Sequence, residues 1–186
     1  TCRRRLMGTG FVIEDGYVLT NAHVVAGTER VALDTVVGVK PAQVVLFDPD
    51  TDIAVLRADE LGLPELRWAE DELAVSDSAV VMGYPKSGPF EAAPVRIRGK
   101  LEIAGPDIYT TGRVEREAYT IRGNIRQGNS GGPLLTPGGE VAGMIFGASL
   151  DTSETGYALT AHQVQQRVGD VRSLTRPADT QACVSG

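Results

Sequence analysis

The chain has 186 residues, of which 42% are hydrophobic and 23% are charged, so a folded hydrophobic core is expected. No window approaches the roughly 18 consecutive apolar residues of a transmembrane helix. The formal net charge of -6 argues against nucleic acid as a partner, because phosphate binding requires clustered cations. The one basic run, residues 3–5, is expected to be a solvated terminal segment.

Short apolar runs separated by Gly, Pro, Asp and Asn dominate the first half of the chain and predict β-strands. Two of these runs flank "EDG" at residues 14–16 and predict a hairpin. The expected strands are residues 10–13, 17–20, 31–33, 42–47 and 53–57. The acidic segment 64–76 has no strong period, which is typical of a linker that crosses to a second half.

The second half predicts further strands and one helix. The expected strands are residues 79–82, 95–104, 119–122, 132–135, 140–146 and 156–159. Thr160 and Gln163 form a capping-box pattern. Val164 and Val168 recur at helical spacing, which predicts a helix over residues 161–168. Strands at this spacing predict an all-β sandwich or a pair of barrels.

Two cysteines, Cys2 and Cys183, lie near opposite ends of the chain in sequence that is typical of loops. A disulfide between them is expected, with two free thiols as the alternative. A disulfide would place the domain outside the reducing cytoplasm. The chain begins with Thr1 and shows no signal peptide, so it is expected to be a segment of a longer protein whose targeting or anchoring element is missing.

The segment "RQGNSGGPL", residues 126–134, places a serine among glycines. Ser130 alone would suit an ordinary tight turn as well as a nucleophile. Two further residues favour the nucleophile, because His23 in "LTNAHVV" directly follows an expected strand and Asp52 in "DTDIAVL" directly precedes one. A serine hydroxyl needs a base such as imidazole, and the imidazole needs a carboxylate that holds its tautomer.

His23, Asp52 and Ser130 therefore form a candidate catalytic triad. Their order along the chain is that of chymotrypsin-type double barrels. This order places His23 and Asp52 in a first barrel and Ser130 in a second, with the site in the cleft between them. The surrounding glycines allow the backbone amides of Gly128 and Ser130 to point at one spot, which predicts an oxyanion hole.

Other residues are weaker candidates for the same roles. Asp48 and Asp50 lie close to Asp52, but only Asp52 abuts the apolar run 53–56 that would anchor it at the start of a strand. His162 lies in the predicted helix and is expected to be solvated. No metal site is expected, because the chain offers too few suitably spaced ligands, and the chemistry needs no cofactor.

The motifs "TNAHVV", "DIAVL" and "GNSGGP" together resemble the trypsin-like serine protease superfamily, and specifically its HtrA-like branch. Within that branch the chain is most similar to the actinobacterial MarP-type proteases. The resemblance implies an all-β, chymotrypsin-like fold of two antiparallel six-stranded β-barrels with a short C-terminal helix. One protease domain is then expected over residues 1–186, with barrels at about 6–70 and 77–160 and the helix and tail at 161–186.

The resemblance also implies an activity and a location. The implied activity is that of a serine endopeptidase that forms an acyl-enzyme intermediate, in envelope stress or acid resistance. MarP-type proteases carry an N-terminal membrane anchor and an extracytoplasmic protease domain, so a periplasmic domain separated from its anchor is expected. The expected partners are proteins or peptides of the cell envelope, the protease itself included, and the membrane only through the missing anchor.

In the resembling fold, the segment before the nucleophile and two later segments line the substrate pocket. The corresponding residues here are Asn124, Ile125, Arg126, Gln127, Phe146, Gly147, Ala148 and Tyr157. None is acidic, so an apolar or medium-sized substrate side chain is expected rather than Arg or Lys. Residues 146–148 are expected to pair with the substrate backbone as an added strand.

Two departures from the family limit what the resemblance implies. Digestive trypsin-like enzymes have an aspartate where this chain has Asn129, so activation by an ion pair with a new N-terminus is not expected. The segment after Val168 is too short for the PDZ domain of HtrA relatives, which favours a monomeric domain over a cage-like assembly. A rival prediction is a catalytically silent module that holds peptides in the cleft without cutting them.

Overall fold

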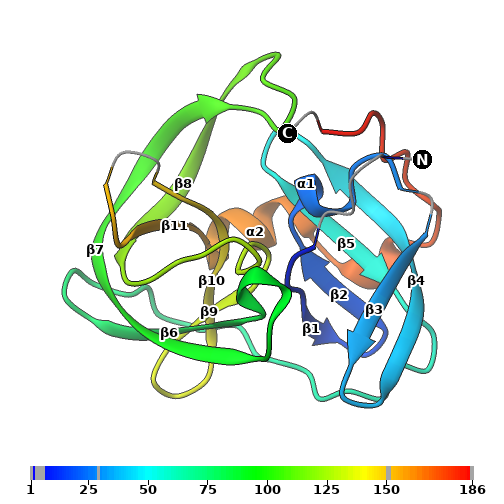
Figure 1. The fold of residues 1–186 in the computed structure, drawn as a ribbon, viewed down its shortest axis with the longest axis horizontal. Helices are drawn as coiled ribbons and strands as arrows, with labels where there is room; N and C mark the ends of the chain where they lie inside the picture. The colour runs from blue at the N-terminus through cyan, green and yellow to red at the C-terminus, as the bar shows by residue number, and fades with distance from the viewer. Residues whose placement is uncertain (1, 3–6, 29, 150–151, 185–186) are drawn as a thin grey trace.

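The computed structural model describes residues 2, 7–28, 30–149 and 152–184 of the chain (Figure 1). Two β units lie side by side, and a helix from the C-terminal part of the chain lies near their junction (Figure 1). No helix in these described ranges is long and apolar enough to cross a membrane.

The N-terminal unit is a five-stranded antiparallel sheet with strand order β1-β2-β5-β4-β3. Its strands are β1 Phe11–Glu14, β2 Tyr17–Thr20, β3 Val31–Thr35, β4 Gly38–Asp48 and β5 Ile53–Arg57. A one-turn helix, α1 Ala22–Val25, directly follows β2. Residues 53–56 of the central strand β5 are all buried, because apolar side chains pack on both faces of the sheet.

The C-terminal unit is a closed antiparallel barrel with strand order β10-β11-β8-β7-β6-β9. Its strands are β6 Ser78–Gly83, β7 Glu91–Pro106, β8 Arg113–Arg122, β9 Pro133–Leu135, β10 Val141–Ala148 and β11 Thr155–Thr160. A 3₁₀ turn, η1 Pro85–Ser87, follows β6. Buried apolar residues such as Tyr119, Ile121 and Ile145 pack together inside the barrel.

Helix α2, Ala161–Val168, forms where the sequence predicts it, and a 3₁₀ turn, η2 Val171–Ser173, follows. The Thr160 hydroxyl accepts a hydrogen bond from the Gln163 backbone N–H at 3.1 Å, which satisfies one free donor at the helix start. Val164 and Val168 are buried in a cluster that contains residues of both β units. This cluster joins the sheet, the barrel and α2 in one core.

The predicted fold class is confirmed, because the chain is mostly β with two antiparallel units and one short C-terminal helix. The N-terminal unit was expected to be a six-stranded barrel, but its described residues form a five-stranded sheet, whereas the C-terminal unit is a closed barrel. Residues 58–77 pass the edge of β1, and the Leu66 N–H donates a backbone hydrogen bond to the Val12 carbonyl there. Pro64 has no N–H, so it cannot extend this pairing into a strand.

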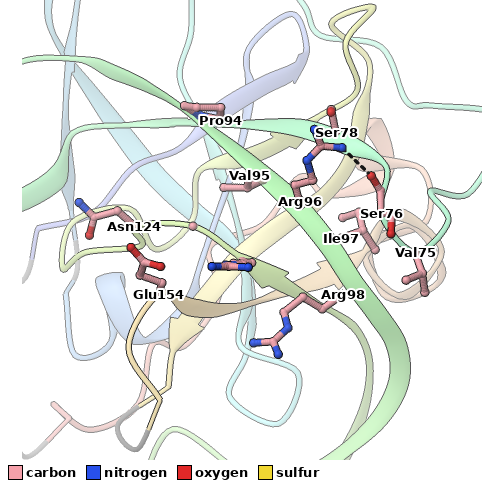
Figure 2. Close-up of a pocket in the computed structure, with 12 residues that line it drawn as sticks. Val75, Ser76, Ser78, Pro94, Val95, Arg96, Ile97, Arg98, Asn124 and Glu154 are labelled. Atoms are coloured by element: carbon pink, nitrogen blue, oxygen red, sulfur yellow. Dashed lines mark hydrogen bonds between the residues drawn. The ribbon is translucent and has the colours of Figure 1, made fainter.

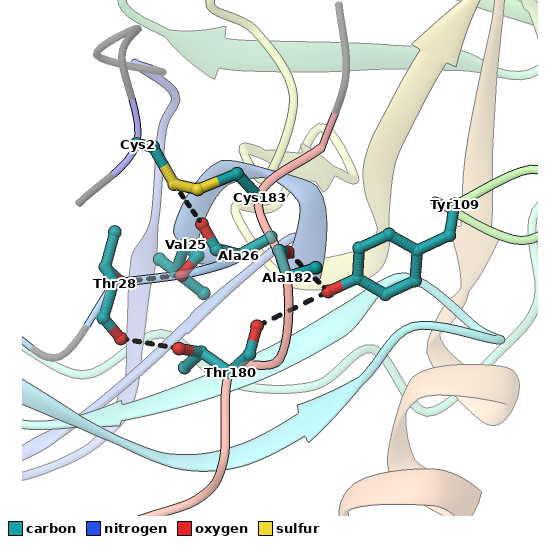
Figure 3. Close-up of a disulfide and its surroundings, with 8 residues drawn as sticks. All are labelled: Cys2, Val25, Ala26, Thr28, Tyr109, Thr180, Ala182 and Cys183. Carbon is teal, nitrogen blue, oxygen red and sulfur yellow. Dashed lines mark hydrogen bonds between the residues drawn. A yellow bond between two sulfur atoms is a disulfide. The ribbon is translucent and has the colours of Figure 1, made fainter.

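The disulfide expected between Cys2 and Cys183 is present (Figure 3). Beside it, the Gly27 N–H, just after α1, donates to the Thr180 carbonyl at 2.9 Å. Tyr109, from the hairpin between β7 and β8, points its hydroxyl at carbonyl groups of the C-terminal tail (Figure 3). The tail is therefore tied both to the segment that carries α1 and to the barrel.

Candidate active site

A histidine and an aspartate of the N-terminal unit lie in direct contact. His23 lies in α1, and Asp52 lies in the turn between β4 and β5. Asp52 Oδ2 lies 2.6 Å from His23 Nδ1, and Asp52 Oδ1 accepts a hydrogen bond from the His23 backbone N–H at 2.8 Å. Asp52 is only 5% exposed, so little water competes for its carboxylate. In the neutral ring this contact favours the proton on Nδ1 and leaves Nε2 as an acceptor.

The turn before β5 is held by its own side chains and by a buried amide. Asp48 accepts hydrogen bonds from the Asp50 N–H and the Thr51 hydroxyl, which closes the turn. Asp52 follows with a φ of 62°, in the left-handed region. Fully buried Asn21 donates from Nδ2 to the Asp52 carbonyl at 2.9 Å. These contacts fix the direction in which the Asp52 carboxylate leaves the backbone.

Two arginines from the C-terminal half also hold this turn. Arg167 of α2 pairs with the Asp48 carboxylate. Arg116 of β8 is buried and donates to the Asp50 carbonyl from Nε at 3.0 Å. Burial raises the pKa of Asp48, but hydrogen bonds from Thr51 and Arg167 outweigh this effect and hold the pKa below its ordinary value. The turn is therefore anchored across the junction between the two units.

Ser130 lies in a tight turn between β8 and β9, packed against the N-terminal unit. The next residue, Gly131, has a φ of 88°, a conformation that favours glycine. A Cβ atom on Gly131 would lie 2.1 Å from the Thr9 carbonyl oxygen and 3.2 Å from the Asn21 backbone nitrogen. The turn therefore touches the junction of β2 and α1, the helix that carries His23.

The backbone of Ser130 is fixed at this junction. Its carbonyl accepts a hydrogen bond from the Thr9 N–H at 2.9 Å. Within the part of the chain that the structure describes, the Ser130 hydroxyl makes no hydrogen bond to His23, whose side chain is 30% exposed. Catalytic hydrogen bonds are often long before substrate binds and shorten in the complex. The structure thus brings the three predicted residues to one junction, with the contact between His23 and Asp52 formed.

The backbone amides of Gly128 and Ser130, predicted to form the oxyanion hole, lie in the nucleophile turn. The Gln127 carbonyl accepts a hydrogen bond from η1, and the Asn129 carbonyl accepts one from within the turn. The C=O and N–H of a trans peptide point in opposite directions. The N–H groups of Gly128 and Ser130 therefore point away from the partners of the Gln127 and Asn129 carbonyls. Among the described residues, neither amide has a hydrogen-bond acceptor. Such free N–H groups are what a developing oxyanion requires.

Residues 124–127, predicted to line the pocket, form the segment that leads to this turn. Ile125 is half-buried and packs beside the barrel core. Arg126 pairs with Glu91 at the start of β7, which neutralises its charge locally. Asn124 and Gln127, the other two residues of the segment, are exposed. The segment therefore offers polar and apolar atoms but no unpaired carboxylate.

The remaining predicted pocket residues lie at the end of β10 and in β11. Gly147 and Ala148 pair with β11, and no other described strand pairs with their opposite side. The rings of Phe146 and Tyr157 lie 6.1 Å apart between centroids. This part of β10 can accept an added strand, and two aromatic rings flank it.

Several supporting residues were not predicted from the sequence. The Thr9 hydroxyl donates to the Gly128 carbonyl at 2.7 Å and accepts from the Tyr84 N–H at 3.1 Å. Asn21 lies inside the motif "TNAHVV", so that motif contained a signal for it. Thr9 and Arg116 lie far along the chain from the residues they contact, so no local pattern marks them. His162 is exposed on α2, as expected.

A buried carboxylate on a histidine, next to a serine in a glycine-rich turn between two antiparallel β units, is the arrangement of a trypsin-like serine protease domain. The family model described as "Trypsin-like peptidase domain" matches residues 8–144. The chain therefore belongs to this family.

Within this family, the chain is similar to HtrA-like and MarP-type proteases, as the motifs predict. The chain is 45% identical over 187 residues to the serine protease Rv3671c of Mycobacterium tuberculosis, covering 99% of this chain and 46% of that protein. It is 35% identical over 149 residues to a "Probable periplasmic serine endoprotease DegP-like" of Chlamydia pneumoniae, covering 76% of this chain and 29% of that protein. The chain thus spans less than half the length of these relatives.

Solved structures agree with the fold. The active form of the Rv3671c protease matches with a TM-score of 0.95 at 44% identity, covering 99% of this chain and 81% of that one. The inactive form matches with a TM-score of 0.82 at 42% identity, covering 93% and 87%. The HtrA-type protease AlgW, at 24% identity and a TM-score of 0.78, shares the fold, with 90% and 52% covered. These relatives support the prediction of a serine endopeptidase, and none supports the silent module.

Proposed function

We propose that the chain cleaves peptide bonds with His23, Asp52 and Ser130 as a catalytic triad. The observation that carries the proposal is the pair of contacts that the Asp52 carboxylate makes with His23, one with the imidazole ring and one with the backbone N–H. In this role Ser130 Oγ attacks the peptide carbonyl, His23 Nε2 accepts the hydroxyl proton, and Asp52 stabilises the imidazolium that forms.

The subsequent steps use the same groups and no cofactor. The Gly128 and Ser130 amides bind the oxyanion of the tetrahedral intermediate, where one such donor is worth about 3 kcal/mol. His23 then gives its proton to the leaving amine, which produces the acyl-enzyme. Water attacks the acyl group with His23 as base and restores the serine.

Substrate is proposed to lie along the free side of residues 146–148 as an added strand. Its side chain before the cleaved bond then enters the pocket between residues 124–127 and Tyr157. The pairing of Arg126 with Glu91 supports an apolar or medium-sized side chain, because neither residues 124–127 nor Tyr157 supplies a carboxylate that could bind Arg or Lys.

The cellular role is proposed from the disulfide and the relatives. A disulfide persists in oxidising compartments, and the relative from Chlamydia pneumoniae is named periplasmic, which supports an extracytoplasmic location. We propose that the domain is monomeric, acts there on cell-envelope proteins and on its own chain during envelope stress or acid exposure, and is anchored to the membrane by a segment of the longer protein.

A fluorophosphonate probe tests the catalytic proposal directly, because it labels only a serine activated by a base. The wild-type chain is expected to be labelled at Ser130 and to cleave a peptide library. Ser130→Ala is expected to lose both activities while its circular dichroism spectrum is unchanged. An unlabelled wild-type chain, or equal labelling of the two proteins, would overturn the proposal.

A further inference from the structure

A pocket of about 790 Å³ opens on the C-terminal barrel, and none of the proposed triad residues lines it (Figure 2). Its walls come from the segment before β6, the first half of β7, the end of β8 and the loop before β11. Asn124 and Glu154 lie next to each other on one side, and Arg96 lies with Ser76 and Ser78 on another (Figure 2).

Three exposed arginines and one glutamate, Glu154, are the charged residues that line this pocket. Arg96 and Arg98 alternate along β7 with the buried residues Val95 and Ile97, so both arginines lie on the outer face of the barrel. Arg122, at the end of β8, is directly opposite Arg96 in the strand register. The sheet therefore gathers three guanidinium groups on one surface.

Among the described residues, none of these three arginines has a carboxylate partner. Arg96 donates to the Ser76 carbonyl at 3.0 Å, and Arg98 donates to the Thr155 hydroxyl at 3.3 Å. Within the described ranges, no acidic group makes an ion pair with any of the three, whereas Arg57, Arg126, Arg167 and Arg172 are all paired. Unpaired cations concentrated in a chain of net charge -6 indicate a site for an anionic ligand.

We propose that this pocket docks an acidic, extended stretch of a protein substrate. Arg96 and Arg98 both lie on the outer face of β7, and Arg98 lies at a β-bulge where the pairing with β8 shifts by one residue. Alternate side chains of an extended peptide lie about 6.6 Å apart. Because both arginine side chains are long and exposed, two alternate carboxylates can meet both guanidinium groups, each through paired hydrogen bonds. The inference rests on the proposed protease function, because it names a class of substrate.

The pocket is continuous with the segment that leads to the proposed nucleophile. Gly123 lines the pocket, and its N–H donates to the Glu154 carbonyl at 2.8 Å. A Cβ atom on Gly123 would lie 2.4 Å from Val95 Cγ1, so this segment packs directly on β7. A substrate held by the arginines is therefore held beside residues 124–127. Docking raises the local concentration of the substrate at the active site without contact with the reacting atoms.

Binding is tested first on the 186-residue chain with Ser130→Ala, which prevents cleavage. A fluorescein-labelled peptide with glutamates at alternate positions is titrated and followed by fluorescence anisotropy. Replacing Arg96, Arg98 and Arg122 together by serine is expected to weaken binding by about tenfold or more. The matched control replaces the exposed residues Arg57, Arg113 and Arg176 by serine, which removes the same charge elsewhere and is expected to change binding less than about twofold. Equal weakening in both triple variants would overturn the proposal, as would inorganic phosphate binding as tightly as the peptide.

Kinetics on the active chain separate this proposal from the proposed function. A neutral peptide substrate and the same peptide with an acidic extension are compared. The extension is expected to lower KM severalfold with kcat unchanged, and the pocket triple variant is expected to lose this gain while cleaving the neutral peptide normally. Cleavage of both peptides with equal KM would overturn the docking proposal alone. No cleavage of either would overturn the protease function.

Discussion

Asp52 adopts a left-handed backbone conformation that asparagine also tolerates. Asp52→Asn therefore changes the charge and the acceptor atoms of the side chain without adding backbone strain. The variant places an NH₂ group beside His23 Nδ1 and disfavours the tautomer that leaves Nε2 free to accept a proton. We expect kcat to fall by about 10⁴-fold while the thermal midpoint stays nearly constant. Peptide hydrolysis assays and thermal melts measure the two quantities.

Asp50→Asn is the matched control. The Asp50 side chain is exposed, and its carbonyl rather than its carboxylate contacts Arg116. This variant is expected to change kcat by less than about twofold. Similar losses in the two variants would remove Asp52 from the proposed triad.

Gly131→Ala tests how tightly the nucleophile turn is packed. The new methyl group would lie 2.1 Å from the Thr9 carbonyl oxygen, so the turn must move away from the N-terminal unit. Gly139 has a similar φ of 85° with no atom within 4 Å of its added Cβ, so Gly139→Ala measures backbone strain alone. We expect Gly139→Ala to lower the free energy of unfolding by about 1 kcal/mol, and Gly131→Ala to lower it by about 1–3 kcal/mol more. Urea titrations compare them, and equal losses would contradict the packing argument.

The residues proposed to carry the chemistry could be predicted from the sequence, whereas the residues that hold them in position could not. His23, Asp52 and Ser130 each lie in a short motif beside a strand, so three local patterns and their order indicated them. Thr9 and Arg116 contact the site across 119 and 66 positions of sequence. Such contacts depend on how the two units meet, which no local pattern contains.

The ion pair between Asp48 and Arg167 joins β4 to α2 and predicts a dependence of stability on pH. The pKa of Asp48 is held below its ordinary value, so its contribution is complete above the unfolded pKa of about 3.9 and disappears as the pH falls through the lower folded value. We expect Asp48→Asn to lower the free energy of unfolding by about 1–2 kcal/mol at pH 7, and the difference from wild type to shrink below about pH 4. Urea titrations between pH 3 and 7 measure it.

Asp170→Asn serves as the control for this pH dependence. Asp170 pairs with Arg172 at the surface, where both side chains are largely exposed, so its replacement is expected to cost little at any of these pH values. A wild-type minus Asp48→Asn difference that stays constant down to pH 3 would contradict the role given to the ion pair.

Strand positions could be predicted from the sequence, whereas strand lengths could not. β8 was expected at residues 119–122 but begins at Arg113, because residues 113–118 pair with β7 in a long hairpin. Charged side chains obscure the apolar signal in that stretch, and the partner strand supplies the hydrogen bonds. Helix α1 has only four residues and no helical period, so its sequence carried no helix signal.

The disulfide and the shared core act on the whole molecule. The core cluster contains residues of the sheet, the barrel and α2, so the two β units are expected to unfold together. The bridge between Cys2 and Cys183 closes a loop with a sequence separation of 181, worth at most about 5 kcal/mol in the loop-entropy model. Reduction is therefore expected to lower the urea midpoint of the wild-type chain.

A double variant, Cys2→Ser with Cys183→Ser, is the control for the reducing agent. It is expected to unfold at the midpoint of the reduced wild-type chain and to be insensitive to dithiothreitol. If the wild-type midpoint does not change on reduction, the disulfide restricts the folded and unfolded chains equally and adds no stability.

The same bridge determines where mechanical tension would travel. A force applied outward at Cys2 and Cys183 passes through the sulfur–sulfur bond, so the strands between them bear no load while the bond is intact. In an optical trap with handles at these two positions, the oxidised domain is expected to extend hardly at all. Reduction under load would release about 600 Å of contour length in one step, because each residue contributes about 3.3–3.6 Å when extended. The protease domain would then behave as a closed link under tension in an oxidising compartment and as an extensible one in a reducing compartment.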